Sequence, residues 1–253
     1  MRLRGSRVSA VRSAPSVRLR GLARPAGSMI PVTFSRGGTN RLTRHDLERF
    51  SGDTLLDRLG RVLCGVGTLP RKELYEAWEV ARRMRRRSRG GRVVDVAGGH
   101  GLLGHVMLLL DDSSPEALVV DPMLPPSAAA LHDAMVAAWP RLRHRVTYVT
   151  TELSGFPLVS SDTVVSSHAC GSLTDQILNS AAAARAPVAV LPCCHDRERC
   201  DAGPLAGWLD DPLAIDVLRA IRLEAEGYQV RTQTIPADIT PKNRLLIGIP
   251  LVG

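Results

Sequence analysis

The chain has 253 residues, of which 44% are hydrophobic, and this length allows one sizeable core with an appendage. No run of eighteen or more apolar residues occurs, because arginine, aspartate or glycine interrupts every hydrophobic stretch, so we expect no membrane-spanning segment. The formal net charge of +8, nearly all of it from arginine, permits binding to a polyanion such as a nucleic acid without establishing it.

Residues 1–42 are predicted to form a basic extension. They contain many arginines and several serines, and no acidic residue precedes Asp46. This composition is typical of an organellar transit peptide, and the alternatives are an unstructured extension or initiation at Met29. The five cysteines lack the spacing of an extracellular disulfide framework, so we expect reduced thiols. The predicted location is cytoplasmic, or mitochondrial or plastid if the extension is a transit peptide.

Residues 43–90 are predicted to form two helices that precede a sheet. Apolar residues fall mostly at helical spacing from Thr43 to Cys64 and again from Pro70 to Arg89. The second helix ends in a basic run at 82–87. Such a run is usually a solvated helix end, and a contact with a phosphate backbone is the alternative interpretation.

From residue 91 to residue 253, short β-rich runs alternate with helical stretches. The predicted strands are Arg92–Val96, Ala117–Val120, Arg145–Val149, Thr163–Ser167, Val188–Leu191, Tyr228–Ile235 and Leu245–Ile249. The predicted helices between the first five strands include Leu102–Leu110, Ala128–Ala138 and Thr174–Arg185. This alternation predicts an α/β fold with a mostly parallel seven-stranded sheet, closed by an antiparallel hairpin at one edge. The layout resembles the Rossmann-like fold of class I methyltransferases.

A glycine-rich loop follows the first predicted strand. The segment Ala97-Gly98-Gly99-His100-Gly101 leads directly into an apolar helix. Glycines let the backbone turn sharply and approach a ligand closely, and the helix N-terminus offers free N–H groups. Residues 99–104 also satisfy the dinucleotide-binding fingerprint, so a nicotinamide or flavin enzyme is a competing interpretation.

Acidic residues favour S-adenosylmethionine as the cofactor. Class I methyltransferases carry an acidic residue where this chain has Asp95, and it engages the cationic amino-acid end of the cofactor through the loop. Asp121 closes the second strand, where a carboxylate accepts both ribose hydroxyls, and a strand-end turn with Pro122 is the alternative. Glu152 is predicted to meet the adenine amino group or to be a solvated loop carboxylate. The predicted cofactor-binding set is Asp95, Ala97, Gly98, Gly99, Gly101, Asp121, Glu152 and Ser167.

Histidine and cysteine follow the fourth and fifth strands. Residues 168–175 read His-Ala-Cys-Gly-Ser-Leu-Thr-Asp and residues 192–195 read Pro-Cys-Cys-His, and both should face the cleft at the carboxyl ends of the strands. These motifs resemble a methyltransferase group that includes the tRNA 2′-O-methyltransferases with a Cys-Cys-His-His motif and related methyltransferase-like proteins. The resemblance spans roughly 92–195, with 239–244 as a further signature. Asp196 stands where the tRNA enzymes have a second histidine.

Two histidines are the catalytic candidates. Either His195 or His168 is predicted to act as the general base, because imidazole titrates near neutral pH. We predict no metal site, because adjacent cysteines are poor tetrahedral partners. The zinc alternative would draw on His168, Cys170, Cys193, Cys194, His195 or Cys200. The simplest interpretation of the cysteines, above all Cys64 and Cys200, is that they are small buried residues.

The sequence thus predicts a methyltransferase that uses S-adenosylmethionine, with RNA as the favoured methyl acceptor. A small-molecule or protein acceptor is the first alternative, and a cofactor-binding but inactive assembly factor is the second. The chain has three each of tryptophan, tyrosine and phenylalanine. This scarcity argues against extended stacking of aromatic side chains on nucleic-acid bases.

Overall fold

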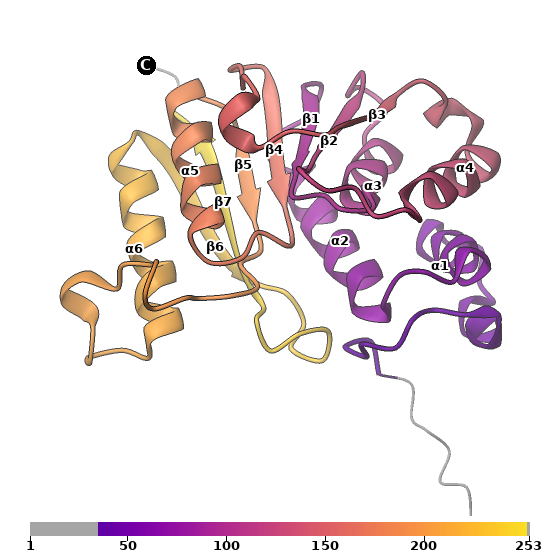
Figure 1. The fold of residues 1–253 in the computed structure, drawn as a ribbon, viewed down its shortest axis with the longest axis horizontal. Helices are drawn as coiled ribbons and strands as arrows, with labels where there is room; N and C mark the ends of the chain where they lie inside the picture. Colours follow the sequence, from indigo (N-terminus) through magenta and orange to yellow (C-terminus); the bar gives the residue numbers. More distant parts are fainter. Residues whose placement is uncertain (1–34, 252–253) are drawn as a thin grey trace, which may run out of the picture. The chain divides into compact units, whose positions relative to one another are not determined.

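The computed structural model describes residues 35–251 and contains one seven-stranded sheet (Figure 1). Most of the predicted extension lies outside the described residues. The strand order is β3-β2-β1-β4-β5-β7-β6, and β7 runs antiparallel to both of its neighbours while the other pairs are parallel. The strands are β1 (Arg92–Val96), β2 (Ala117–Val120), β3 (Val146–Val149), β4 (Asp162–Ser166), β5 (Val188–Val190), β6 (Tyr228–Thr234) and β7 (Arg244–Pro250). The predicted α/β fold is confirmed.

Helices cover both faces of the sheet. Neighbouring residues of a strand point to opposite faces, and in these strands both faces carry apolar side chains. Val93 and Val119 belong to one core, which includes α2 and α3, whereas Val94 and Val120 belong to the other, which includes α5 and α6 (Figure 1). The helices are α1 (Leu55–Val66), α2 (Arg71–Met84), α3 (Leu102–Leu110), α4 (Ala128–Ala138), α5 (Ser172–Ala184) and α6 (Asp211–Ala225).

The region before the sheet is more divided than the sequence predicted. The stretch expected as one helix consists of a 3₁₀ helix, η1 (Arg44–Phe50), followed by α1. The break falls before Thr54, whose side chain caps α1 by accepting the N–H of Asp57 at 3.1 Å. Two α-helices therefore precede the sheet, as predicted, with one additional short helix.

Packing begins before residue 43, where the sequence analysis placed the start of the helical region. Leu42 is fully buried, and its N–H donates to the Leu69 carbonyl at 2.9 Å. Its neighbour Arg41 forms an isolated antiparallel bridge with Pro70. The partners lie 27 and more residues further along the chain, so no local pattern could have revealed this packing.

Helix α6 is an element that the sequence analysis did not name. Asp210 caps it by accepting the N–H of Leu213 at 3.3 Å, and Pro212 lies in its first turn. Ile215 and Leu223 are buried on its inner side. The cap, the proline and these apolar residues were the signal that could have found it.

The last two strands form the predicted antiparallel hairpin at one edge of the sheet. β7 lies inside, paired with β5, and β6 is the edge strand. The connecting loop is closed by Ile235 and Asn243, which exchange hydrogen bonds of 2.9 Å. Because β7 starts where the parallel strands end, this loop lies at the carboxyl edge of the sheet.

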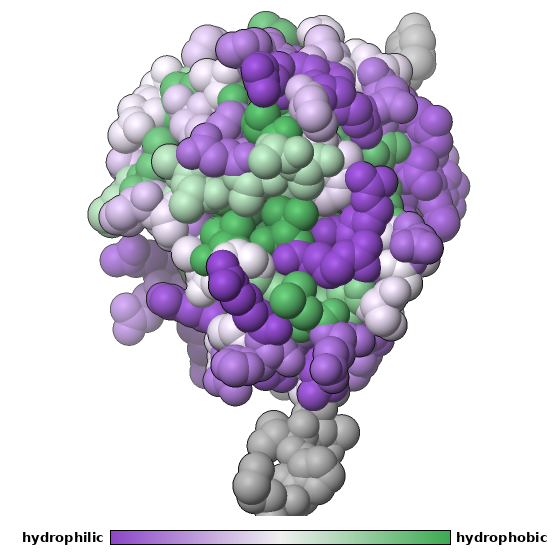
Figure 2. All heavy atoms as spheres, turned by 90° about the vertical axis from the view of Figure 1, so that its right-hand side faces the viewer, coloured by the Kyte–Doolittle hydropathy of each residue, from purple (hydrophilic) through white to green (hydrophobic). Residues whose placement is uncertain are grey.

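The face built from α1 and α4 carries a shallow, largely apolar groove of about 540 Å³. Figure 2 shows this side of the molecule, with apolar surface surrounded by hydrophilic side chains. The groove is lined by Arg61, Val62, Gly65, Val66, Ala130, Ala134, Ala137 and Ala138. Within residues 35–251, no helix combines the length and the apolar character needed to cross a membrane.

The basic run at residues 82–87 spans the end of α2 and the turn that follows it. The helix has 14 residues, which span about 21 Å, and its last turn leads to the start of β1. Arg82 and Arg83 pair with Glu79 in the same helix, whereas Arg86 and Arg87 are exposed. Arg83 also donates to the carbonyl of Thr234, the last residue of β6, at 3.3 Å, so part of the run is packed against the protein and part is solvated.

Candidate functional site

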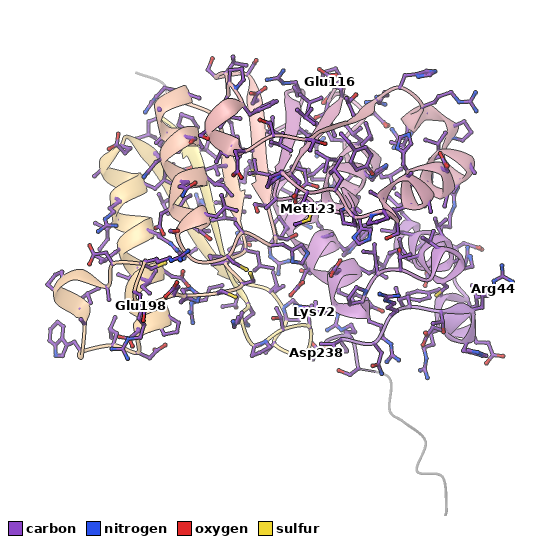
Figure 3. The ribbon with its side chains drawn as sticks, viewed as in Figure 1. Arg44, Lys72, Glu116, Met123, Glu198 and Asp238 are labelled. Carbon is purple, nitrogen blue, oxygen red and sulfur yellow. The ribbon has the colours of Figure 1, made fainter. Side chains whose placement is uncertain are left out.

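The loops that follow β1, β2 and β4 enclose a cavity at the carboxyl edge of the sheet. Its volume is about 360 Å³, within the range of ligand sites. In Figure 3, Met123 lies on this side of β2, and Glu116, which precedes β2, lies at the opposite edge. The cavity is lined by Glu73, Ala77, Ala97, Gly98, Gly99, His100, Leu102, Leu103, Asp121, Met123, Pro125, Ser167 and His168. Six of the predicted site residues are therefore brought together.

The loop after β1 presents its backbone to this cavity. Ala97, Gly99 and Gly101 have left-handed backbone, with φ of 54°, 51° and 76°. A Cβ on Gly98 would lie 2.8 Å from the side chain of Asp95, so glycine allows the loop to pack on the sheet. A Cβ on Gly99 would meet nothing within 4 Å and would project into free space. A ligand can therefore approach this backbone closely.

Asp95 and Asp121, two of the three predicted carboxylates, have different positions. Asp95 is 1% exposed, accepts the N–H of Gly104 at 2.9 Å and joins the loop to α3; burial raises its pKa to about 7. Asp121 lines the cavity and accepts the N–H groups of Gly99 at 3.0 Å and Met123 at 2.9 Å. A carboxylate has about four acceptor positions, so Asp121 retains capacity for ligand hydroxyls.

Two histidines and one glutamate line the cavity, and burial shifts the pKa of each. Burial lowers the pKa of His168 to about 4, and the nearby Lys72 ammonium acts in the same direction, so this imidazole is neutral at neutral pH. Burial also lowers the pKa of His100. In contrast, burial raises the pKa of Glu73 to about 7, assisted by the neighbouring Glu76. The cavity thus holds neutral imidazoles and a carboxyl group that changes charge near pH 7.

Glu73 should make the stability of the protein depend on pH. The folded chain keeps the Glu73 proton between pH 4.5 and about 7, where the unfolded chain releases it, so stability falls as pH rises through this range. Glutamine at this position cannot ionise. We therefore expect the free energy of unfolding of Glu73→Gln, relative to that of the wild type, to rise by about 1–3 kcal/mol between pH 4.5 and pH 8. Denaturant unfolding at both pH values measures it, with the exposed Glu48→Gln as control. A constant difference would contradict the raised pKa.

The structure does not place His195 in the cavity, contrary to our expectation. Its side chain is 4% exposed and its Nε2 lies 2.8 Å from Asp216 on α6. Asp216 also accepts from Arg219 at 3.2 Å and Arg244 at 2.7 Å. The ring is therefore held within a network of charged groups beside α6, and His168 is the candidate base that lines the cavity.

Three other predicted residues also do not line the cavity: Glu152, Gly101 and the buried Asp95. Glu152 is exposed and precedes a short 3₁₀ helix, η3 (Leu153–Gly155). Gly101 begins α3 and packs on the sheet, since a Cβ there would lie 2.7 Å from Val119. The adenine contact expected of Glu152 therefore has no support from the geometry of the cavity.

Seven cavity residues were absent from the predicted set, namely Glu73, Ala77, His100, Leu102, Leu103, Met123 and Pro125. Glu73 and Ala77 lie on α2, which reaches the cavity by packing along α3. His100 belongs to the glycine-rich loop, and Met123, which is 80% exposed, follows Asp121. The two loop residues could have been found by treating each strand-end loop as a continuous lining.

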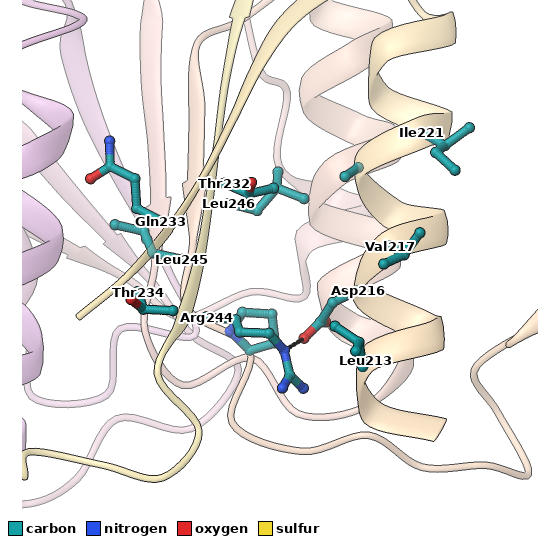
Figure 4. Close-up of a pocket in the computed structure, with 12 residues that line it drawn as sticks. Leu213, Asp216, Val217, Ile221, Thr232, Gln233, Thr234, Arg244, Leu245 and Leu246 are labelled. Atoms are coloured by element: carbon teal, nitrogen blue, oxygen red, sulfur yellow. Dashed lines mark hydrogen bonds and ion pairs between the residues drawn. The ribbon is translucent and has the colours of Figure 1, made fainter. Parts of the chain in front are cut away.

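A second cavity, of about 500 Å³, lies between α6 and strands β6 and β7 (Figure 4). Apolar side chains such as Val217, Ile221 and Leu246 line it, and the ion pair of Arg244 and Asp216 lies beside them. None of the predicted cofactor-binding residues lines this cavity. Five of those eight residues line the cavity beside β1 and β2.

Several solved structures are similar to this chain. An O-methyltransferase family protein from Burkholderia thailandensis is 19% identical, with a TM-score of 0.50 over 82% of this chain and 63% of its own length. Human N-acetylserotonin methyltransferase, solved with S-adenosylmethionine, is 16% identical over 77% and 56% of the two chains, with a TM-score of 0.41. The B. subtilis tRNA methyltransferase TrmK is 12% identical over 69% and 65%, with a TM-score of 0.45. At 19% identity the first likeness concerns the fold alone.

A family model matches this chain directly. Residues 72–199 match the family described as a methyltransferase domain, which is half of the chain and includes every residue that lines the cavity beside β1. A comparison with curated proteins finds no significant match. The chain belongs to the methyltransferase domain family, as the sequence predicted.

Proposed function

We propose that the protein transfers the methyl group of S-adenosylmethionine to a hydroxyl or amino group of a small molecule, with His168 accepting the proton that is released. The observation that carries this proposal is that His168 lines the same cavity as the glycine-rich loop and Asp121. A group that binds the cofactor and a group that can remove a proton are therefore within one enclosure.

The cavity residues fit a nucleoside cofactor with a charged amino-acid end. Asp121 would accept the ribose hydroxyls with its remaining acceptor positions, and the backbone of Ala97 to Gly99 would hold the amino-acid end. Ser166 Oγ, next to the lining residue Ser167, is buried with no hydrogen-bond partner among residues 35–251. When bound, S-adenosylmethionine supplies an electrophilic methyl group on a sulfonium ion.

His168 is suited to accept a proton from the methyl acceptor. Burial keeps its pKa near 4, so the ring nitrogens carry no extra proton at neutral pH. A neutral imidazole can accept a hydrogen bond from a hydroxyl or amine and remove its proton as the new bond to carbon forms. This task requires that His168 lie near the acceptor, which its position after β4 allows.

Charge distribution favours a small acceptor over RNA. Residues 1–34 contain seven arginines and no acidic residue, which leaves 26 basic and 25 acidic residues in 35–253. Two arginines of the basic run on α2, Arg82 and Arg83, are already paired with Glu79. The methyltransferase domain itself therefore lacks the net positive charge by which polyanion-binding proteins gain most of their affinity.

RNA is the second candidate acceptor. It is supported by the resemblance of residues 168–175 and 192–195 to tRNA 2′-O-methyltransferases and by the arginines of residues 1–34. In this alternative the basic residues would bind phosphates at a distance from the reacting group, and binding would weaken steeply with salt.

Incubation with labelled cofactor separates these acceptors. The full-length chain is given S-adenosylmethionine with a labelled methyl group, together with either a small-molecule extract or total RNA. We expect label to enter the small-molecule fraction, and to do so only with an intact His168. Label that enters RNA, and that is lost when salt rises from 50 to 200 mM, would instead support the RNA alternative. Calorimetry with NADH should show no binding.

Replacing Asp121 by alanine should weaken cofactor binding. The variant loses the acceptor for two ribose hydroxyls and the hydrogen bonds that shape the loop at Gly99 and Met123. We expect a loss of about 1–3 kcal/mol in the binding free energy of S-adenosylmethionine, measured by calorimetry. Glu152→Ala is the matched control, because this exposed carboxylate does not line the cavity. Equal affinity of Asp121→Ala and wild type would remove Asp121 from the site.

A further inference from the structure

Three cysteine thiols from two loops meet at the carboxyl edge of the sheet. Cys170 follows β4, and Cys193 and Cys194 follow β5. The Sγ of Cys170 lies 2.9 Å from that of Cys193 and 3.6 Å from that of Cys194, and all three Sγ atoms lie within 4.8 Å of one another. None of the three lines the cofactor cavity, and the proposed methyl transfer uses none of them.

Backbone contacts hold the two loops together. Cys170 and Cys194 pair as an isolated parallel bridge, and the N–H of Gly171 donates to the Cys194 carbonyl at 3.3 Å. Arg219, which is 2% exposed, donates to the Gly171 carbonyl at 2.9 Å. The thiols are thus positioned by a supported scaffold, which a ligand site needs.

The arrangement of sulfur atoms suits an ion better than a disulfide. A disulfide has an S–S distance of about 2.05 Å and would join two of the sulfurs, leaving the third unused. Thiolates bound at about 2.3 Å to a tetrahedral zinc ion lie roughly 3.8 Å apart. Cys170 and Cys194 are already near that separation at 3.6 Å, and Cys193 needs only a small outward shift.

Lys242 supplies a compensating charge. Its Nζ lies 3.8 Å from the Sγ of Cys194. Three thiolates around a divalent ion have a net charge of −1, which one ammonium group balances. Hydrogen bonds from such a neighbouring group to a ligand sulfur also orient the ligand and tune the affinity for the metal.

We infer that Cys170, Cys193 and Cys194 form a binding site for a soft divalent cation of the zinc class. Thiolates select such ions over magnesium or calcium. Three protein ligands leave a fourth position for water, and the exposed Cys170 provides access from solvent. The bound ion would join the loops after β4 and β5. The sequence predicted no metal site, because Cys193 and Cys194 are adjacent. In the structure, Cys170 approaches both of them from the other loop.

Metal analysis of the full-length protein tests the site. Protein purified under reducing conditions without chelators should contain about one zinc ion per chain, measured by inductively coupled plasma mass spectrometry. Titration with cobalt(II) should give thiolate-to-cobalt charge-transfer absorption that saturates at one equivalent. Cys170→Ser should abolish both signals, and Lys242→Gln should weaken zinc binding by about 10–100-fold.

Cys64→Ala is the control, because Cys64 is buried in α1 at 1% exposure and should leave the metal content unchanged. If Cys170→Ser fails to fold, alkylation of the wild type provides the test, since zinc should protect the otherwise exposed Cys170. A wild-type protein that binds neither zinc nor cobalt, or a metal content that survives Cys170→Ser, overturns the inference. Neither result depends on methyl transfer.

Discussion

His168→Ala is expected to lower the rate of methyl transfer by about 10²–10⁴-fold, the usual range for loss of a general base. His168 lines the cavity beside β1, and its low pKa keeps the imidazole unprotonated at neutral pH. Alanine cannot accept a proton, whereas Asp121 and the loop backbone remain to bind the cofactor. Steady-state kinetics with the identified acceptor, together with calorimetry of S-adenosylmethionine, separate the rate from the cofactor affinity.

His195→Ala is the informative comparison for this prediction. The His195 ring is 4% exposed and is paired with Asp216. Its loss should therefore lower the free energy of unfolding, while the rate of methyl transfer per folded molecule should change little. A rate loss of about 10²-fold or more in His195→Ala, with little change in His168→Ala, would restore the base assignment expected from the sequence. A large loss confined to Glu73→Gln would assign the proton to that carboxylate, whose pKa is near 7.

Arg219→Ala is expected to lower the free energy of unfolding by about 3–5 kcal/mol, as when one partner of a buried ion pair is removed. Arg219 is 2% exposed, binds Asp175 with two hydrogen bonds of 2.9 and 2.8 Å, and also contacts Asp216 and the Gly171 carbonyl. Without the guanidinium, Asp175 and Asp216 lose a charged partner, and the Asp216 side chain is only 11% exposed. Urea unfolding monitored by circular dichroism measures the change.

Arg222→Ala is the matched control, one turn further along α6. Arg222 and its partner Asp201 are 54% and 60% exposed, so solvent screens their interaction. We expect a change below about 1 kcal/mol. Equal losses in both variants would show that the buried network around Arg219 contributes no more than a surface ion pair.

The sequence determined the sheet because its strands are locally recognisable. In a parallel sheet covered on both faces, strand residues are apolar on both sides, so runs such as Arg92–Val96 and Ala117–Val120 stand out from polar connections. The hairpin of β6 and β7 followed from a turn-rich segment between two β-rich runs. Asp210 and Pro212 mark the start of helix α6 in the sequence, so this helix was also predictable although it was not predicted.

The glycine-rich loop was likewise predictable, because a left-handed backbone and close packing impose local requirements that glycine meets. Gly98 and Gly99 line the cavity for these reasons, and Asp121 joins them because carboxyl ends of neighbouring parallel strands share one edge. Residue type and position within a βα unit are enough to place such groups.

Only the tertiary structure decided which groups the side chains of the loops contact. His195 turns toward Asp216, 21 residues later on α6, and Cys170 meets cysteines 23 and 24 residues later. Glu73 reaches the cavity beside β1 from a helix that precedes the sheet. Periodicity reports which side of a regular element is buried, but loop residues have no period. Their orientation and their pKa values depend on contacts between segments that are distant in the sequence and adjacent only after folding.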